Sequence, residues 1–112
     1  MPGIIFEMVG GEVVVRPDVE GATQNDPLQA VQGDLVNWNN RTDQCHHPVA
    51  VDPAGLFLTD EIPPGRSSDP LFNVTQTPGT TITYMCSRHP DNAKERGRIT
   101  VVPLSGAGGA DV

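Results

Sequence analysis

The sequence of 112 residues has no long apolar run. Its longer apolar stretches, such as Val13-Val14-Val15, have the length of a strand. A membrane-spanning helix needs about 18 or more consecutive apolar residues. The sequence pattern therefore predicts no membrane span.

Basic residues are also scarce. Seven Lys and Arg residues stand against fourteen Asp and Glu residues, which gives a formal net charge of −7 at pH 7. Recognition of a phosphate backbone needs clustered Lys and Arg, so the composition argues against nucleic acid as a partner. The negative charge favours solubility or docking with a basic partner.

Motifs of common enzyme classes and of secretion signals are missing too. The sequence has no nucleophile-elbow or phosphate-loop motif, and its carboxylates, among them Asp52, Asp60 and Asp91, are scattered rather than paired for acid–base chemistry. Met1-Pro2-Gly3 is not the basic start of a secretory signal, and no long apolar segment follows it. We expect a periplasmic or extracellular location if a signal has been removed, with a cytoplasmic location as the alternative. Two cysteines do not decide between them.

Turn-forming residues, in contrast, are abundant. Twelve glycines and eleven prolines are spread along the chain without a repeat, which favours short strands over long helices. Segments rich in apolar and β-branched residues predict strands at 4–9, 12–16, 28–31, 35–38, 49–51, 71–74, 80–85 and 98–102. Seven or eight such strands indicate an all-β sandwich or barrel. The best candidate for a helix is one or two turns at 91–96.

The length allows one domain with one hydrophobic core. We place this domain at residues 1–103, with Trp38 packed between the sheets. Residues 104–112 are small and rich in glycine, and we expect them to form a flexible tail.

The residues most suited to chemistry lie in two groups about 40 positions apart. They are Cys45-His46-His47 and Cys86-Ser87-Arg88-His89, each at the junction of a predicted strand and a loop. A thiolate together with imidazoles suits copper or zinc. One cysteine and two histidines with a weak fourth contact are typical of electron-transfer copper. The two groups therefore predict a metal site.

The segments around these two groups resemble the cupredoxins, a family of small copper proteins. Residues 27–40, PLQAVQGDLVNWNN, resemble the stretch of that family that leads to the first histidine ligand, and residues 79–90, GTTITYMCSRHP, resemble its closing strand and ligand loop. The turn at 63–65 and the last strand at 97–102 also fit, so the resemblance covers most of residues 27–102. The plastocyanin and amicyanin types are the most similar in pattern. The resemblance implies a Greek-key β-sandwich that binds one copper ion.

By this resemblance, Cys86 is the thiolate ligand and His89 is one imidazole ligand. The other imidazole is His46 when residues are counted forward from Trp38, and His47 when they are counted back from the strand at 49–51. Adjacent side chains of a strand point to opposite faces. We therefore expect one of the two histidines to bind the metal and the other to face solvent or to mediate electron entry.

The sequence departs from the family at the fourth ligand. The family usually has a methionine three to five residues after the second histidine, where this chain has Asn92, Ala93 and Lys94. The axial position is expected to be empty or to hold water, a backbone carbonyl or the side chain of Asn92. Red copper proteins of the nitrosocyanin type are similar in their Cys-x-x-His-Pro loop and in lacking a methionine, which implies an accessible coordination position.

Three functions fit these observations. The overall pattern favours a one-electron carrier that docks as a monomer with a redox partner protein. The missing methionine favours a copper-dependent enzyme with an open coordination position that acts on a small molecule. The third is a metal-free scaffold closed by a disulfide between Cys45 and Cys86.

Overall fold

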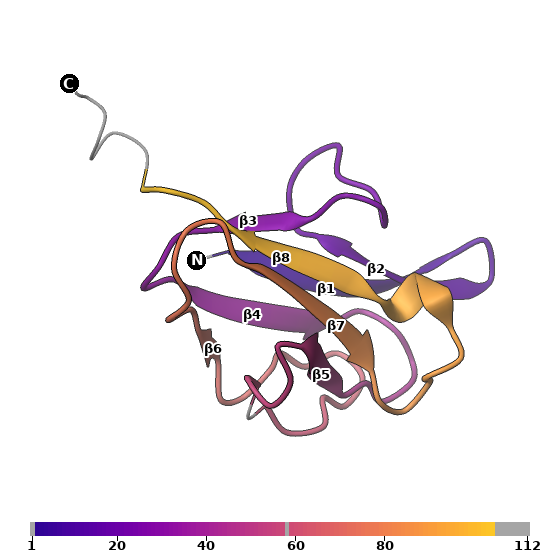
Figure 1. Cartoon of the computed structure of the whole chain (residues 1–112). Helices are drawn as coiled ribbons and strands as arrows, with labels where there is room; N and C mark the ends of the chain where they lie inside the picture. Colours follow the sequence, from indigo (N-terminus) through magenta and orange to yellow (C-terminus); the bar gives the residue numbers. More distant parts are fainter. Residues whose placement is uncertain (1, 58, 105–112) are drawn as a thin grey trace.

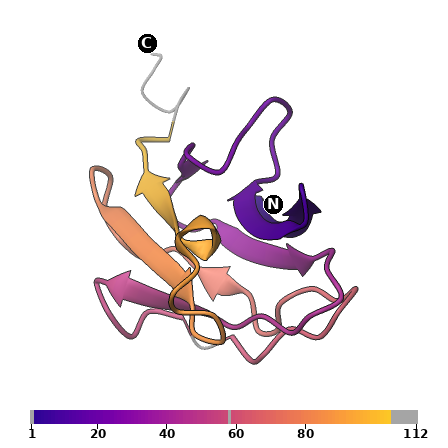
Figure 2. The same cartoon turned by 90° about the vertical axis from the view of Figure 1, so that its right-hand side faces the viewer.

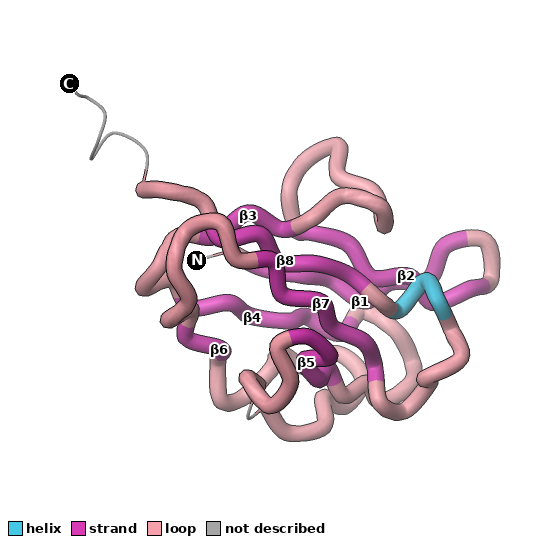
Figure 3. Tube along the Cα trace, viewed as in Figure 1, coloured by secondary structure: helices cyan, strands magenta, loops and turns pink. Residues whose placement is uncertain are grey.

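The computed structural model describes residues 2–57 and 59–104 and consists of two four-stranded sheets (Figures 1 and 3). One sheet has the strand order β2-β1-β4-β6, and the other has the order β3-β8-β7-β5. The strands are β1 (Gly3–Val9), β2 (Glu12–Pro17), β3 (Leu28–Ala30), β4 (Leu35–Asn40), β5 (Pro48–Asp52), β6 (Phe72–Asn73), β7 (Thr81–Cys86) and β8 (Gly97–Val101). The prediction of an all-β fold with eight short strands is confirmed.

A single 3₁₀ turn, η1 (Ala93–Glu95), is the helical element of the described residues, and it lies within the predicted 91–96. No helix among these residues is long and apolar enough to cross a membrane. The flexible tail expected at 104–112 lies outside the described residues except for Leu104.

Antiparallel hairpins and parallel pairings both contribute to the sheets. β1 and β2 form a hairpin that pairs Val9 with Glu12. Its turn residues Gly10 and Gly11 have φ angles of 59° and 82°, a conformation that favours glycine and matches the twist of a two-residue hairpin. β1 also pairs in parallel with β4, and β3 pairs in parallel with β8. The chain therefore crosses between the two sheets several times, and residues distant in sequence meet.

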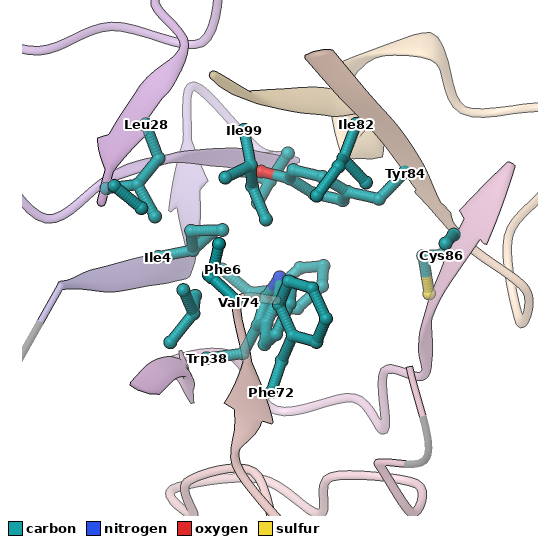
Figure 4. Close-up of a cluster of buried hydrophobic side chains, with 14 of the residues drawn as sticks. Ile4, Phe6, Leu28, Trp38, Phe72, Val74, Ile82, Tyr84, Cys86 and Ile99 are labelled. Carbon is teal, nitrogen blue, oxygen red and sulfur yellow. The ribbon is translucent and has the colours of Figure 1, made fainter. Parts of the chain in front are cut away.

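The core fills the space between the sheets (Figure 4). Trp38 and Phe6 of one sheet and Ile82 of the other are all completely buried. The Trp38 ring lies edge-on to that of Tyr84, with 5.7 Å between the ring centroids. Cys86 belongs to the same buried cluster and lies at one end of it, opposite Leu28 (Figure 4). The core therefore continues up to the cysteine.

The strand pairing at this end brings the two predicted ligand groups together. Cys86, the last residue of β7, pairs with Pro48, the first residue of β5, so the histidines before Pro48 lie beside the cysteine. His46 also pairs with Ile62 in an isolated antiparallel bridge. The segment from β7 to β8 then passes through η1, which faces the viewer in Figure 2. His46 and Cys86 thus lie near the paired ends of β5 and β7, and His89 lies in the loop that passes through η1.

Candidate metal centre

Four side chains with metal-binding atoms meet at this end of the fold. His46, Cys86, His89 and Glu95 each offer one donor atom, and these atoms all lie within 4.8 Å of one another. Three of these residues come from the two predicted groups, and the fourth comes from η1. The side chains of His46 and Glu95 are 0% and 2% exposed, whereas that of His89 is 35% exposed. The site is therefore buried with one edge at the surface.

The distances between these donor atoms are close to those around a single metal ion. The Cys86 Sγ atom lies 3.7 Å from the Nδ1 atoms of both His46 and His89. Glu95 Oε1 lies 3.0 Å from His46 Nδ1 and 3.2 Å from His89 Nδ1. A four-coordinate metal with bonds of about 2.0 to 2.3 Å holds its donors about 3.3 to 3.8 Å apart. The two sulfur–nitrogen distances fall within this range, whereas the two distances from Glu95 Oε1 are shorter, so the carboxylate would move outward slightly to share one ion with the other donors.

The orientation of His46 is fixed on its far side by a chain of hydrogen bonds. The Thr42 hydroxyl donates to Asn40 Oδ1 at 2.7 Å and lies 2.7 Å from His46 Nε2. A hydroxyl has one proton to donate; with that proton directed to Asn40 Oδ1, the Thr42 oxygen can accept from the Nε2–H group of His46. That tautomer leaves a lone pair on Nδ1, the atom that faces Cys86 and Glu95. The His46 ring also stacks on Phe6 at 4.3 Å between centroids.

The surroundings also favour uncharged or metal-bound forms of the two buried ligands. Burial lowers the pKa of His46, with the Glu95 carboxylate acting in the opposite direction. Burial raises the pKa of the Cys86 thiol, while the backbone N–H groups of His47 and Arg88 lower it. A lone pair on imidazole, a sulfur and a carboxylate oxygen converge on one point, so a bound cation would neutralise their mutual repulsion.

His47 lies outside this cluster. Its backbone N–H donates to Cys86 Sγ at 3.4 Å, and its ring nitrogens lie 2.9 Å from Ser87 Oγ and from the Thr59 carbonyl oxygen. The structure thus brings His46, and not His47, to the other donors. His47 instead supports the backbone around the cysteine.

The second cysteine lies at the rim of the site. Both Cys45 and Cys86 are free thiols, which argues against the disulfide-linked scaffold. Cys45 lines an open depression of about 510 Å³ together with Gln44, Ser87, Arg88 and His89. The exposed edge of His89 is therefore reached from solvent through a mostly uncharged surface.

Glu95 is the site residue that the sequence reasoning missed. The search for a fourth ligand ended at Lys94, because the family places its methionine three to five residues after the second histidine. Glu95 is six residues after His89 and stands in a polar segment, DNAKER, that has the composition of a solvated surface. Asn92, considered as an axial donor, turns its side chain to Glu95 and to the backbone instead. A search of the loop for any carboxylate would have found Glu95.

Comparison with solved structures identifies the architecture. A purple cupredoxin from Nitrosopumilus maritimus superposes with a TM-score of 0.64 and 21% sequence identity, over 88% of this chain and 97% of that one. The chain has the cupredoxin fold. A reduced Cu(I) amicyanin variant is also similar, with a TM-score of 0.58 and 20% identity over 88% of this chain and 81% of that one.

Part of a larger protein is similar in structure as well. A multicopper oxidase from Pseudomonas thermotolerans matches with a TM-score of 0.53 and 18% identity, over 89% of this chain and 28% of the oxidase. A scan of protein-family models and a search of curated protein sequences both gave no match. The chain thus combines the cupredoxin fold with a His-Cys-His-Glu cluster that could hold a metal ion.

Proposed function

We propose that this protein binds one copper ion through His46, Cys86 and His89, with Glu95 as the fourth donor, and acts as a one-electron carrier. The observation that carries the proposal is the convergence of these four donor atoms at one end of a cupredoxin fold. Bound copper would supply a one-electron couple between Cu(II) and Cu(I). A thiolate with two imidazoles is the donor set of electron-transfer copper sites.

The chain contributes rigidity to such a centre. Cys86 ends a paired strand, and His46 is held by Phe6 on one side and Thr42 on the other. Donors held by packing and hydrogen bonds change position little when the charge of a bound ion changes. A small structural change favours fast electron exchange and supports the role of a carrier.

Glu95 supports the carrier over the enzyme. Its Oε1 atom faces both histidines, and it would supply the fourth donor where the sequence predicts a position open to a small molecule. A carboxylate is a harder, anionic donor than the thioether of methionine. We expect it to favour Cu(II) and to give a lower reduction potential than a methionine-ligated site.

The exposed edge of His89 is the expected point of electron exchange. The other ligands are buried, whereas His89 opens onto the depression that Cys45 and Arg88 help to line. A redox partner protein that covers this depression would come closest to the metal there. The proposal therefore places partner docking around His89.

The test is to add one equivalent of Cu(II) to the reduced protein and to record optical and EPR spectra and the reduction potential. We expect intense visible absorption from the thiolate–copper bond, which Cys86→Ser abolishes. Glu95→Gln should shift the bands, change the hyperfine splitting and raise the potential. The matched control is Glu61→Gln, since Glu61 is an exposed carboxylate paired with Arg88, and it should leave the spectra unchanged.

Two results would overturn the proposal. One is the absence of thiolate–copper absorption while both thiols remain free. The other is tight retention of Zn²⁺ with no reversible copper couple, because cysteine, histidine and carboxylate are also zinc donors. That second result would indicate a structural zinc site.

A further inference from the structure

Asn92 lies between the ligand loop, Glu95 and the opposite sheet. Its backbone N–H donates to the His89 carbonyl at 3.1 Å, and its own carbonyl accepts from the N–H of Glu95 at 3.0 Å. Its side chain caps the N-terminus of η1, since Asn92 Oδ1 accepts from the backbone N–H of Lys94 at 3.1 Å. The backbone of Asn92 therefore connects one proposed ligand with the other.

The amide group of Asn92 is engaged in hydrogen bonds at both of its ends. Its oxygen is engaged by the N–H of Lys94, and its nitrogen has no free lone pair to offer a metal. Nδ2 donates at 2.6 Å to Glu95 Oε2 and at 3.2 Å to the carbonyl oxygen of Val13. Val13 belongs to β2, in the sheet that does not carry Cys86. Asn92 thus ties the Glu95 carboxylate to the backbone of the opposite sheet.

This contact gives the two oxygens of Glu95 different surroundings. Oε2 accepts from Asn92, while Oε1 faces the Nδ1 atoms of His46 and His89. The carboxylate is buried, so its rotation would break the hydrogen bond from Asn92 with no water to replace it. One oxygen is therefore directed to the donor cluster, and the other is directed away from it.

We propose that Asn92 is a positioning residue that holds Glu95 so that a single carboxylate oxygen, Oε1, faces the metal position. This inference rests on the proposed function in so far as the ion is copper. It goes further by assigning to Asn92 the choice between one-oxygen and two-oxygen coordination by Glu95. Hydrogen-bond partners of metal ligands typically change metal affinity by about 10- to 100-fold when they are removed.

Two variants separate this role from that of a helix cap. Asn92→Asp keeps an oxygen that can accept from Lys94 N–H, but it replaces the donor to Glu95 with a second carboxylate oxygen. Asn92→Ser keeps a good N-cap residue, but its side chain is too short to span the same contacts. The matched control is Lys94→Ala, which removes the 2.6 Å ion pair between Lys94 and Glu12 and so weakens a different contact of η1 with the β1–β2 hairpin.

The measurements are Cu(II) EPR and optical spectra, copper affinity by competition with a chelator, and NMR of the Asn92 side-chain amide in the metal-free protein. We expect both Asn92 variants to lose about 10- to 100-fold in copper affinity and to change the EPR hyperfine splitting, and Lys94→Ala to change neither. In the metal-free protein, Glu95→Gln should shift the Asn92 amide signals, and Glu61→Gln should not.

The outcomes distinguish this inference from the proposed function. If the wild-type protein shows the thiolate–copper spectrum and both Asn92 variants keep its hyperfine splitting and affinity, the positioning role is overturned and the copper site stands. If the wild-type protein shows no such spectrum, the copper assignment fails. The NMR comparison then tests the Asn92–Glu95 contact by itself, and unshifted Asn92 signals in Glu95→Gln would overturn it.

Discussion

Thr42→Val removes one hydroxyl on the side of the His46 ring that faces away from the cluster, and yet it should weaken metal binding. Thr42 is 7% exposed, and valine has nearly the same shape. The hydroxyl connects Asn40 Oδ1 with His46 Nε2, at 2.7 Å from each. The substitution therefore tests the hydrogen-bond chain with little change in packing.

The magnitude follows from which groups lose their partners. Asn40 Oδ1 keeps a hydrogen bond from the backbone N–H of residue 42, at 2.9 Å in the wild-type protein. The Nε2–H group of the fully buried His46 loses the one acceptor it has in the described structure. A buried donor left unpaired costs about 1 to 3 kcal/mol of unfolding free energy. We expect Thr42→Val to destabilise the metal-free protein by at most that amount, because the His46 proton can instead move to Nδ1, where Glu95 Oε1 lies 3.0 Å away.

The effect on the metal site has a separate cause. Without an acceptor at Nε2, the imidazole proton can move to Nδ1, where Glu95 Oε1 lies 3.0 Å away and accepts it. A proton on Nδ1 occupies the lone pair that the metal needs. We expect copper affinity to fall about 10- to 100-fold, the usual effect of losing such a partner.

Urea unfolding of the metal-free protein, chelator competition for copper and NMR of the His46 ring nitrogens would measure the three effects. Thr42→Ser is the matched control, because it keeps the hydroxyl and loses one methyl group, worth about 1 kcal/mol. The reasoning is refuted if the valine and serine variants have the same copper affinity and the same His46 tautomer.

Two further predictions concern stability. Gly97→Ala should destabilise the fold by about 1 to 3 kcal/mol, because a Cβ atom there would overlap the Tyr84 hydroxyl; equal urea midpoints for the variant and the wild-type protein would contradict this. The metal-free protein should lose stability as the pH falls below about 6.5, since burial lowers the pKa of His46 and the unfolded chain takes up the proton first. That residue contributes at most about 1.4 kcal/mol per pH unit, and the dependence should be shallower in His46→Gln when unfolding is measured at pH 7.5 and 5.5.

Much of the fold could be predicted from the sequence because its signals are local. Glycines and prolines separate the strands, and β-branched and apolar residues form them. The predicted segment 4–9 begins one residue after β1 does, and the segment 80–85 is shifted by one residue from β7. The ends of β6 are less predictable, because this strand is short. The sequence predicts a strand at 71–74, and only Phe72–Asn73 is paired. A short edge strand depends on its one neighbour, β4, for its pairing.

The candidate site was predicted in part. The resemblance to the cupredoxin ligand loop predicts Cys86 and His89 as ligands, and these two residues lie together in the structure. The choice between His46 and His47 stayed open in the sequence, because counting from the two flanking strands gave different answers. The pairing of β5 with β7 and the packing of Phe6 turn His46 to the cluster. Neither contact is visible in the spacing of residues 45–47.

The sequence by itself determined the class of the protein: an acidic, all-β chain whose two histidine–cysteine groups suit a soft metal. These properties follow from composition, turn residues and spacing, which act over a few neighbouring positions. Only the tertiary structure decided that Glu95 completes the donor cluster and that Asn92 holds it. A carboxylate in a polar segment looks solvent-exposed until the fold buries it. Here β2 supplies the Val13 carbonyl that anchors Asn92, from 79 residues away.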